Sequence, residues 1–219
     1  MDINSNLSIL ASFLCVVLTI VVFEKTPLDL RVQDRFYDPV RGWRIDAQAP
    51  VPRLIFYQGP KWVLVAFVLG LVACMLVPGL PLDARQAGFL ITCIVVAPIT
   101  AWFIKRQTGV LYPCYVDRYG GTEPYRTLFE SIPRVPGRVR GRGFPAAHCS
   151  GAFALMSLYF VMPPHLQWAG LAFGMATGWI VGIYQMLKGV HYLSHTITTM
   201  FLVWTIILAL SRAFGLGAA

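Results

Sequence analysis

Charged residues are scarce in this sequence. Asp, Glu, Lys and Arg together make up 13% of its 219 residues, whereas hydrophobic residues make up 57%. Soluble domains usually carry about 25% charged residues, so this composition excludes an ordinary soluble protein and suits contact with lipid. The sequence therefore predicts an integral membrane protein, and its length predicts a single domain that spans residues 1–219.

Acidic residues are fewer than basic residues. Ten Asp and Glu stand against 18 Lys and Arg, which gives a net charge of +8. A basic chain is a candidate for binding nucleic acid, because Lys and Arg neutralise phosphates. Here the basic residues lie between apolar runs, which favours membrane lipid headgroups or a phosphorylated lipid substrate. We therefore expect lipid partners and no nucleic acid.

Paired cysteine motifs are also absent. The five cysteines form no Cys-x-x-Cys pair, and three of them lie within or beside apolar runs, as small buried hydrophobic residues do. The sequence therefore predicts no disulfide framework, no metal site and no cofactor. Asp2 is the only charge before the first apolar run, so that run is predicted to be a retained helix and not a signal peptide.

Long apolar runs dominate what is present. A helix needs roughly 20 apolar residues to cross a hydrocarbon core about 30 Å thick. Residues 144–187 contain no Lys, Arg, Asp or Glu, and Pro163-Pro164 divides them, since proline breaks a helix. The sequence predicts an all-α bundle of six transmembrane helices. They cover residues 7–23, 62–82, 87–104, 148–161, 167–187 and 191–210.

Two polar connections remain between these runs. Residues 24–61 are mixed in charge and amphipathic in places, which predicts a short helix on the membrane surface. Residues 105–143 hold eight basic residues against three acidic ones. This second connection is either a solvated loop or a cap that binds anions.

Three of the four histidines, all but His165, stand at predicted helix starts. Ionisable residues at membrane depth are costly, so they are functional candidates by default. Gln185, Lys188, His191 and His195 recur at steps of three or four residues, and one helical face holds them if the helix runs on through Gly189. Histidines that hydrogen-bond between helices are a second interpretation. A third interpretation is that the His191-x-x-x-His195 pair binds a metal ion, although no carboxylate or thiolate nearby in sequence completes a site.

The candidate residues fall into three stretches with defined spacing. Lys105 is followed after six residues by Tyr112-Pro113; the second stretch reads Pro145-Ala146-Ala147-His148; and Tyr184-Gln185 is followed after five residues by His191 and after three more by His195. Together they resemble the type 2 phosphatidic acid phosphatase (PAP2) superfamily of membrane lipid phosphatases. That family has the motifs Lys-x6-Arg-Pro, Pro-Ser-Gly-His and Ser-Arg-x5-His-x3-Asp. The resemblance implies the same six-helix fold for the whole chain.

Several motif positions depart from the family pattern. Tyr112 and Gln185 stand where the family has arginines, Ala146-Ala147 replaces Ser-Gly, and His195 replaces the aspartate. Both essential histidines are present. The chain therefore resembles either a divergent subgroup with a rearranged phosphate site or an inactive relative.

The resemblance implies a mechanism that does not use a metal. His191 attacks phosphorus and forms a phosphohistidine, and His148 protonates the leaving alkoxide. His195 takes the place of the aspartate that orients the nucleophile, and it can accept the same hydrogen bond when neutral. The phosphoryl oxygens are held by cations, for which the candidates are Lys105, Lys188, Arg118, Arg140 and Arg142.

The implied activity is hydrolysis of a lipid phosphomonoester or pyrophosphate. Lipid A, phosphatidylglycerophosphate, phosphatidic acid and undecaprenyl pyrophosphate all present phosphate at the membrane surface. The family resemblance implies a multi-pass protein of the bacterial inner membrane with its active site facing the periplasm. The positive-inside rule points the other way, because the basic connections would then be cytoplasmic. Residues recruited to bind phosphate are poor markers of topology, so we expect the periplasmic orientation.

Two other classes of function are open. Six spans and Ser150 near a helix start are similar to a rhomboid-type intramembrane serine protease, in which Ser150 would pair with His195 or His191. A non-enzymatic protein that binds haem or lipid is the second, with His148 and His191 as haem ligands. Cations at the helix ends suit phosphate better than a porphyrin.

Overall fold

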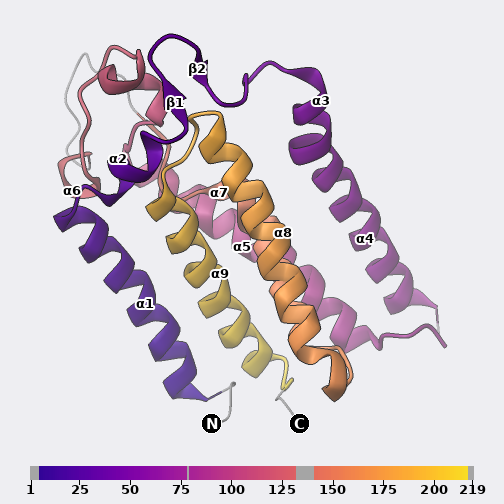
Figure 1. Cartoon of the computed structure of the whole chain (residues 1–219). Coiled ribbons are helices and arrows are strands. Elements are labelled where there is room, and N and C mark those ends of the chain that lie inside the picture. Colours follow the sequence, from indigo (N-terminus) through magenta and orange to yellow (C-terminus); the bar gives the residue numbers. More distant parts are fainter. Residues whose placement is uncertain (1–4, 78, 132–140, 217–219) are drawn as a thin grey trace.

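Five helices are long and apolar enough to cross a membrane. The structure, a computed structural model, describes residues 5–77, 79–131 and 141–216. Within those residues the five are α1 (Asn6–Lys25), α4 (Gly59–Leu76), α5 (Ala84–Thr108), α8 (Gln167–Leu187) and α9 (Leu193–Ala213). Figure 1 shows them side by side as one bundle, with α1 and α4 at opposite edges. They match five of the six expected spans.

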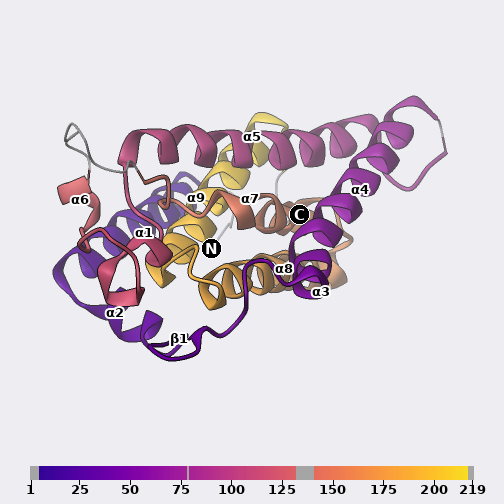
Figure 2. The same cartoon turned by 90° about the horizontal axis from the view of Figure 1, so that it is seen from above.

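The expected fourth span, residues 148–161, takes a different form. It consists of α7 (Ala147–Phe153), which continues as the 3₁₀-helix η4 (Ala154–Phe160). A 3₁₀-helix rises about 2.0 Å per residue instead of about 1.5 Å, so this short segment reaches further than an α-helix of equal length. It packs against α5, α8 and α9, and Figure 2 shows α7 among them in the view from above. The all-helical membrane bundle is therefore confirmed, with its fourth member irregular.

A stripe of glycines lets α8 approach its neighbours closely. Gly170, Gly174, Gly178 and Gly182 recur every four residues and are buried. A Cβ at Gly174 would lie 2.1 Å from the backbone nitrogen of Met156 in η4. Small residues at this spacing are typical of close helix packing in membranes. The sequence analysis missed this pattern, although it is visible in the sequence.

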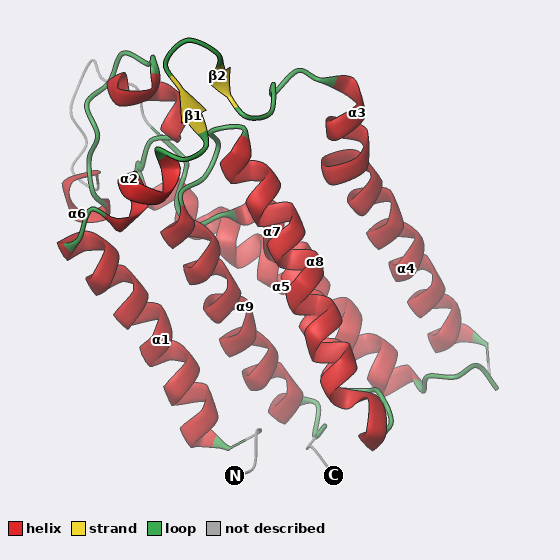
Figure 3. Cartoon of the chain, in the orientation of Figure 1, coloured by secondary structure: helices red, strands yellow, loops and turns green. Residues whose placement is uncertain are grey.

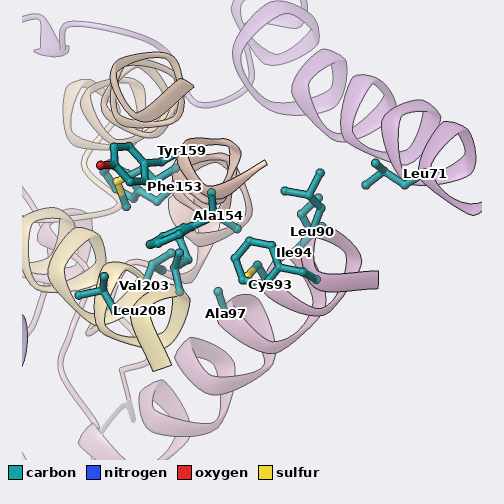
Figure 4. Close-up of a cluster of buried hydrophobic side chains, with 14 of the residues drawn as sticks. Leu71, Leu90, Cys93, Ile94, Ala97, Phe153, Ala154, Tyr159, Val203 and Leu208 are labelled. Carbon is teal, nitrogen blue, oxygen red and sulfur yellow. The ribbon is translucent and has the colours of Figure 1, made fainter. Parts of the chain in front are cut away.

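The hydrophobic core lies between α5, α7, η4 and α9. Figure 4 shows its side chains converging from these helices, with Cys93 and Ala97 from α5, Phe153 from α7 and Val203 from α9. The outward surfaces of α1, α4 and α8 expose large apolar side chains. Examples are Leu7, Leu18, Trp62, Val63, Leu69 and Phe173. Such a surface suits hydrocarbon and not water.

Short elements gather at one end of the bundle (Figure 3). The first connection contains a short helix, a hairpin of two strands with two residues each, and two helical turns, and the basic connection contains a series of single turns. They are α2 (Leu28–Gln33), β1 (Tyr37–Asp38), β2 (Gly42–Trp43), α3 (Pro50–Arg53), the π-helix η1 (Leu54–Gln58), η2 (Pro113–Tyr115), η3 (Asp117–Tyr119) and α6 (Leu128–Ser131). The hairpin is a small exception to the all-α prediction. The turn η5 (Pro164–Leu166) lies between η4 and α8.

Candidate active site

The connection between α8 and α9 sets the position of His191. Gln185, Lys188, His191 and His195 would share one helical face only if the helix ran on through Gly189, and it does not. Gly189 has φ +74° and ends α8: its N–H donates to the carbonyl of Met186, and the N–H of Val190 donates to that of Gln185. These two bonds form a Schellman motif, which stops a helix. His191 therefore lies in a short connection, and α9 begins at Leu193.

The three candidate histidines lie together at this end of the bundle. His148 comes from the first turn of α7, His191 from the connection and His195 from the first turn of α9. The His148 Nδ1 and His191 Nε2 atoms are 2.8 Å apart, which is a hydrogen bond. On the other side of the ring, the Nδ1 atoms of His191 and His195 are 3.5 Å apart. The structure thus brings together three residues that lie up to 47 positions apart in the sequence.

His191 is completely buried. The backbone of Gly143 is a hydrogen-bond partner of both His191 and His195, and the ring of Tyr112 meets that of His191 edge-on at 5.9 Å between centroids. Burial, with the nearby charges of His148, His195 and Lys105, holds the pKa of His191 well below its ordinary value. A neutral imidazole has a free lone pair, as a nucleophile requires.

Two cations flank the histidines from the side of α5 and the basic connection. Lys105 lies in the last turn of α5, half-buried, and interacts electrostatically with both His148 and His191. Arg142 is exposed, and its charge acts on Lys105 and on the hydroxyl of Tyr112. Both residues were predicted to hold phosphate, and the structure places Lys105 near the histidine pair and Arg142 near Lys105.

Lys188 approaches His148 from the end of α8. It is the residue that follows the last turn of that helix, and its charge acts on His148. Burial and the nearby Arg53 and Lys61 lower the pKa of Lys188. Tyr57 lies beside it, with its ring centroid 5.8 Å from that of His148. The sequence analysis missed Arg53, Tyr57 and Lys61, because nothing in their local sequence distinguishes them from other interfacial residues.

Arg118, another of the candidate arginines, has a different partner in the structure. Arg118 forms a two-pronged ion pair with Asp34, with Nε–Oδ1 and Nη2–Oδ2 distances of 2.8 Å each. The carboxylate already occupies its guanidinium, so we remove Arg118 from the predicted phosphate site. Arg140 lies outside the described residues.

A buried carboxylate supports the start of α9. Asp29 in α2 accepts hydrogen bonds from the backbone N–H and the hydroxyl of Ser194, at 2.9 and 2.5 Å. Burial raises the pKa of Asp29 to about 6, although the bonds from Ser194 oppose that effect. A carboxylate on the free N–H groups of a helix start stabilises that helix. The sequence analysis missed Asp29, whose partner is 165 residues away.

Two motif positions that depart from the family pattern are filled by buried side chains. Gln185 is fully buried, and its amide nitrogen and oxygen have no hydrogen-bond partner among the described residues. Ala146 is also fully buried, and its N–H donates to the hydroxyl of Thr199 at 2.9 Å. Neither residue carries the guanidinium or hydroxyl group that the family has at its position.

The other interpretations find less support in the geometry. The Ser150 hydroxyl donates to the carbonyl of Ala147 at 2.8 Å and is buried, so it does not face a histidine as a protease dyad requires. His148 and His191 contact each other directly, whereas haem ligands face each other across an iron. Within residues 5–77, 79–131 and 141–216, no group of three or more His, Cys, Asp or Glu side chains has the arrangement of a metal site.

Comparison with known proteins gives two matches. The sequence model of the PAP2 superfamily matches residues 86–216, a range that contains Lys105 and all three histidines. Among solved structures, the chain is similar to the crystal structure of the first transmembrane PAP2-type phosphatidylglycerolphosphate phosphatase from Bacillus subtilis, with 11% identity and a TM-score of 0.48. That similarity covers 96% of this chain and 88% of the other. No curated protein matches the chain.

Proposed function

This chain belongs to the PAP2 superfamily, and we propose that it is a membrane lipid phosphatase that works through a phosphohistidine. The observation that carries the proposal is the 2.8 Å contact between His148 Nδ1 and His191 Nε2. It puts a nucleophile and a proton donor within reach of one phosphoryl group. The cations around them, which form no ion pair with acidic residues in the described part of the chain, supply positive charge for the phosphoryl oxygens.

The proposed first step transfers the phosphoryl group to His191. Its Nε2 lone pair attacks phosphorus, because the Nδ1 atom on the other side of the ring faces His195 and the Gly143 backbone. The bond from phosphorus to the lipid oxygen breaks, and His148, which the negative charge of the bound phosphate favours in its protonated form, gives its proton to that oxygen. The products of this step are a lipid alcohol, or a lipid monophosphate from a diphosphate, and a phosphohistidine.

The second step releases phosphate. His148, now neutral, accepts a proton from water while the water oxygen attacks the phosphorus of the phosphohistidine. The bond from phosphorus to Nε2 breaks, and its electron pair returns to His191. Lys105, Lys188 and Arg142 stabilise the charge on the phosphoryl oxygens in both steps. His195 positions the ring of His191 in place of the family's aspartate.

The substrate class follows from the family and the position of the site. We propose a lipid phosphomonoester or pyrophosphate, with lipid A, phosphatidylglycerophosphate, phosphatidic acid and undecaprenyl pyrophosphate as candidates. The chain would act as one domain, residues 1–219, in the bacterial inner membrane with the site facing the periplasm. The connection between α8 and α9, which contains His191, lies at the same end of the bundle as the short elements (Figure 1), which suits a phosphate at a membrane surface.

Phosphate release in detergent tests the proposal. The purified chain should release inorganic phosphate from at least one of the four lipids, and vanadate should block the reaction. His191→Ala should abolish release. His165→Ala is the matched control, since His165 is exposed in η5, away from the other histidines. Full activity in His191→Ala would show that the assigned nucleophile is wrong, and inactivity on all four lipids would favour an inactive relative.

A further inference from the structure

A second group of cations surrounds the ring of Tyr57, and the proposed chemistry uses only one of them. Tyr57 lies in the π-helix η1, an element that is rare in proteins and frequent at functional sites. The Nζ atoms of Lys61 and Lys188 lie 3.7 and 5.3 Å from the ring centroid. Lys188 Nζ also lies 4.8 Å from the ring of Tyr184. The aromatic faces hold the two ammonium groups in place without neutralising their charge.

Among the residues that the structure describes, no carboxylate forms an ion pair with these cations. The ion pairs in the described part of the chain are Arg118–Asp34 and Arg126–Glu123, so Arg53, Lys61 and Lys188 have no acidic partner there. Arg53 and Lys61 both act electrostatically on Lys188. Like charges this close repel one another, and an anion between them would relieve that repulsion.

An unpartnered hydroxyl lies beside the same group. The Tyr184 ring stacks on Phe56 with centroids 5.4 Å apart, and the charge of Arg53 acts on its hydroxyl. Tyr184 is only 2% exposed, and its hydroxyl has no hydrogen-bond partner among the described residues. Buried polar groups in folded proteins are nearly always hydrogen-bonded. A ligand oxygen would satisfy this hydroxyl and meet the cations at once.

We propose that Arg53, Tyr57, Lys61 and Tyr184 form a second anion subsite, which shares Lys188 with the transfer site. Its ligand is a second phosphorus group on the same headgroup, so the preferred substrates are lipids that carry two phosphorus groups. The Tyr57 ring lies 5.8 Å from the ring of His148, within one headgroup of the phosphoryl group under attack. This inference rests on the proposed phosphatase activity and narrows its substrate class.

Two pairs of substrates with matched tails test the inference. Dodecyl phosphate and dodecyl diphosphate differ only in the second phosphate. The second pair is phosphatidic acid and phosphatidylglycerophosphate with the same acyl chains. Phosphatidic acid has one phosphorus group, whereas phosphatidylglycerophosphate has a second one, in a phosphodiester. The wild-type kcat/KM should be at least tenfold higher for the second member of one pair or both. The pair that shows the preference tells whether a diphosphate or a separated phosphodiester fits.

The double variant Arg53→Gln/Lys61→Gln should reduce that preference at least tenfold. The control Arg35→Gln/Arg41→Gln removes the same charge at two exposed positions of the first connection and should keep the wild-type preference. If the double variant is inactive on every substrate, the two single variants carry the same test.

Three results would overturn the inference. One is a wild-type enzyme without preference in either pair. Another is a double variant that keeps measurable turnover but loses the same factor of activity on all four substrates, as expected if these cations only attract bilayer lipids. The third is an unchanged preference in the double variant. In all three the wild type remains an active phosphatase, whereas failure of the proposed function would show as no turnover of any substrate.

Discussion

His148 Nδ1 and His191 Nε2 are hydrogen-bonded at 2.8 Å across the gap between α7 and the α8–α9 connection. The lone pair that would attack phosphorus therefore faces the proton donor, and a phosphoryl group has to enter between the two rings. Gly143 and His195 hold the far side of the His191 ring. The ring that has room to give way is that of His148, which is only partly buried.

Replacing His148 should slow the chemistry in a manner that depends on the leaving group. Loss of a general acid costs about 10²- to 10⁴-fold in rate. We expect His148→Ala to lose activity in this range on a lipid phosphate, whose alkoxide needs a proton. The loss should be much smaller for formation of the phosphoenzyme from p-nitrophenyl phosphate, whose leaving group does not. Rapid-quench detection of acid-labile phosphoenzyme measures that step, and an equal loss on both substrates would contradict the role.

Replacing Lys105 should lower kcat and leave the protein folded. Removal of one group that stabilises transition-state charge costs about 10²- to 10³-fold in kcat, so Lys105→Gln should fall in this range. Arg106→Gln is the matched control, because the neighbouring Arg106 is exposed and packs over the Trp102 ring at 4.6 Å. Steady-state kinetics on one lipid phosphate compares them. Equal effects of the two changes would place Lys105 outside the site.

Asp29 should make the stability of the chain depend on pH. Its folded pKa of about 6 lies above the ordinary value of 3.8, so the folded state takes up the proton first as the pH falls. Folding should therefore become more favourable between pH 7.5 and 4, by at most about 3 kcal/mol at about 1.36 kcal/mol per pKa unit. Asp29→Asn should lack this contribution.

Thermal unfolding of wild type and Asp29→Asn in detergent measures the effect. The difference in their midpoints should move in favour of the wild type as the pH falls. Asp46→Asn, the same change at an exposed position, controls for net charge. A difference between wild type and Asp29→Asn that stays constant with pH would show that burial does not perturb this carboxyl.

The glycine stripe of α8 should tolerate no side chain. A Cβ at Gly174 would lie 2.1 Å from the backbone nitrogen of Met156, which cannot move without shifting η4. We expect Gly174→Ala to destabilise the fold by a few kcal/mol, since overpacking typically costs about 1–3 kcal/mol. Gly70→Ala is the control on α4, where a Cβ meets nothing within 4 Å. There alanine should be neutral or stabilising, by up to about 1 kcal/mol. Thermal midpoints in detergent compare them, and a tolerated Gly174→Ala would refute the close contact.

The sequence alone determined the membrane class and five of the six spans. Apolar length and its interruption by Pro163-Pro164 are local properties, and hydrocarbon thickness converts them directly into helices. Motif spacing also identified Lys105, His148 and His191 as candidates, and the structure places them together. The predicted spans also ended at residue 187 and began again at 191. Whether the helix ran on through Gly189 was left open, and the Schellman bonds of Gly189 and Val190 show that it ends there.

Only the tertiary structure decided which side chains are partners. Arg118 meets Asp34 across 84 residues, and Asp29 meets Ser194 across 165. Such pairs depend on how the polar connections fold over the bundle, and no local pattern encodes that. The fold of these connections also places Tyr57 beside His148 and Lys188, and Lys61 beside Tyr57. The motif histidines were predictable because their spacing is local, whereas the charges around them come from distant segments that packing brings together.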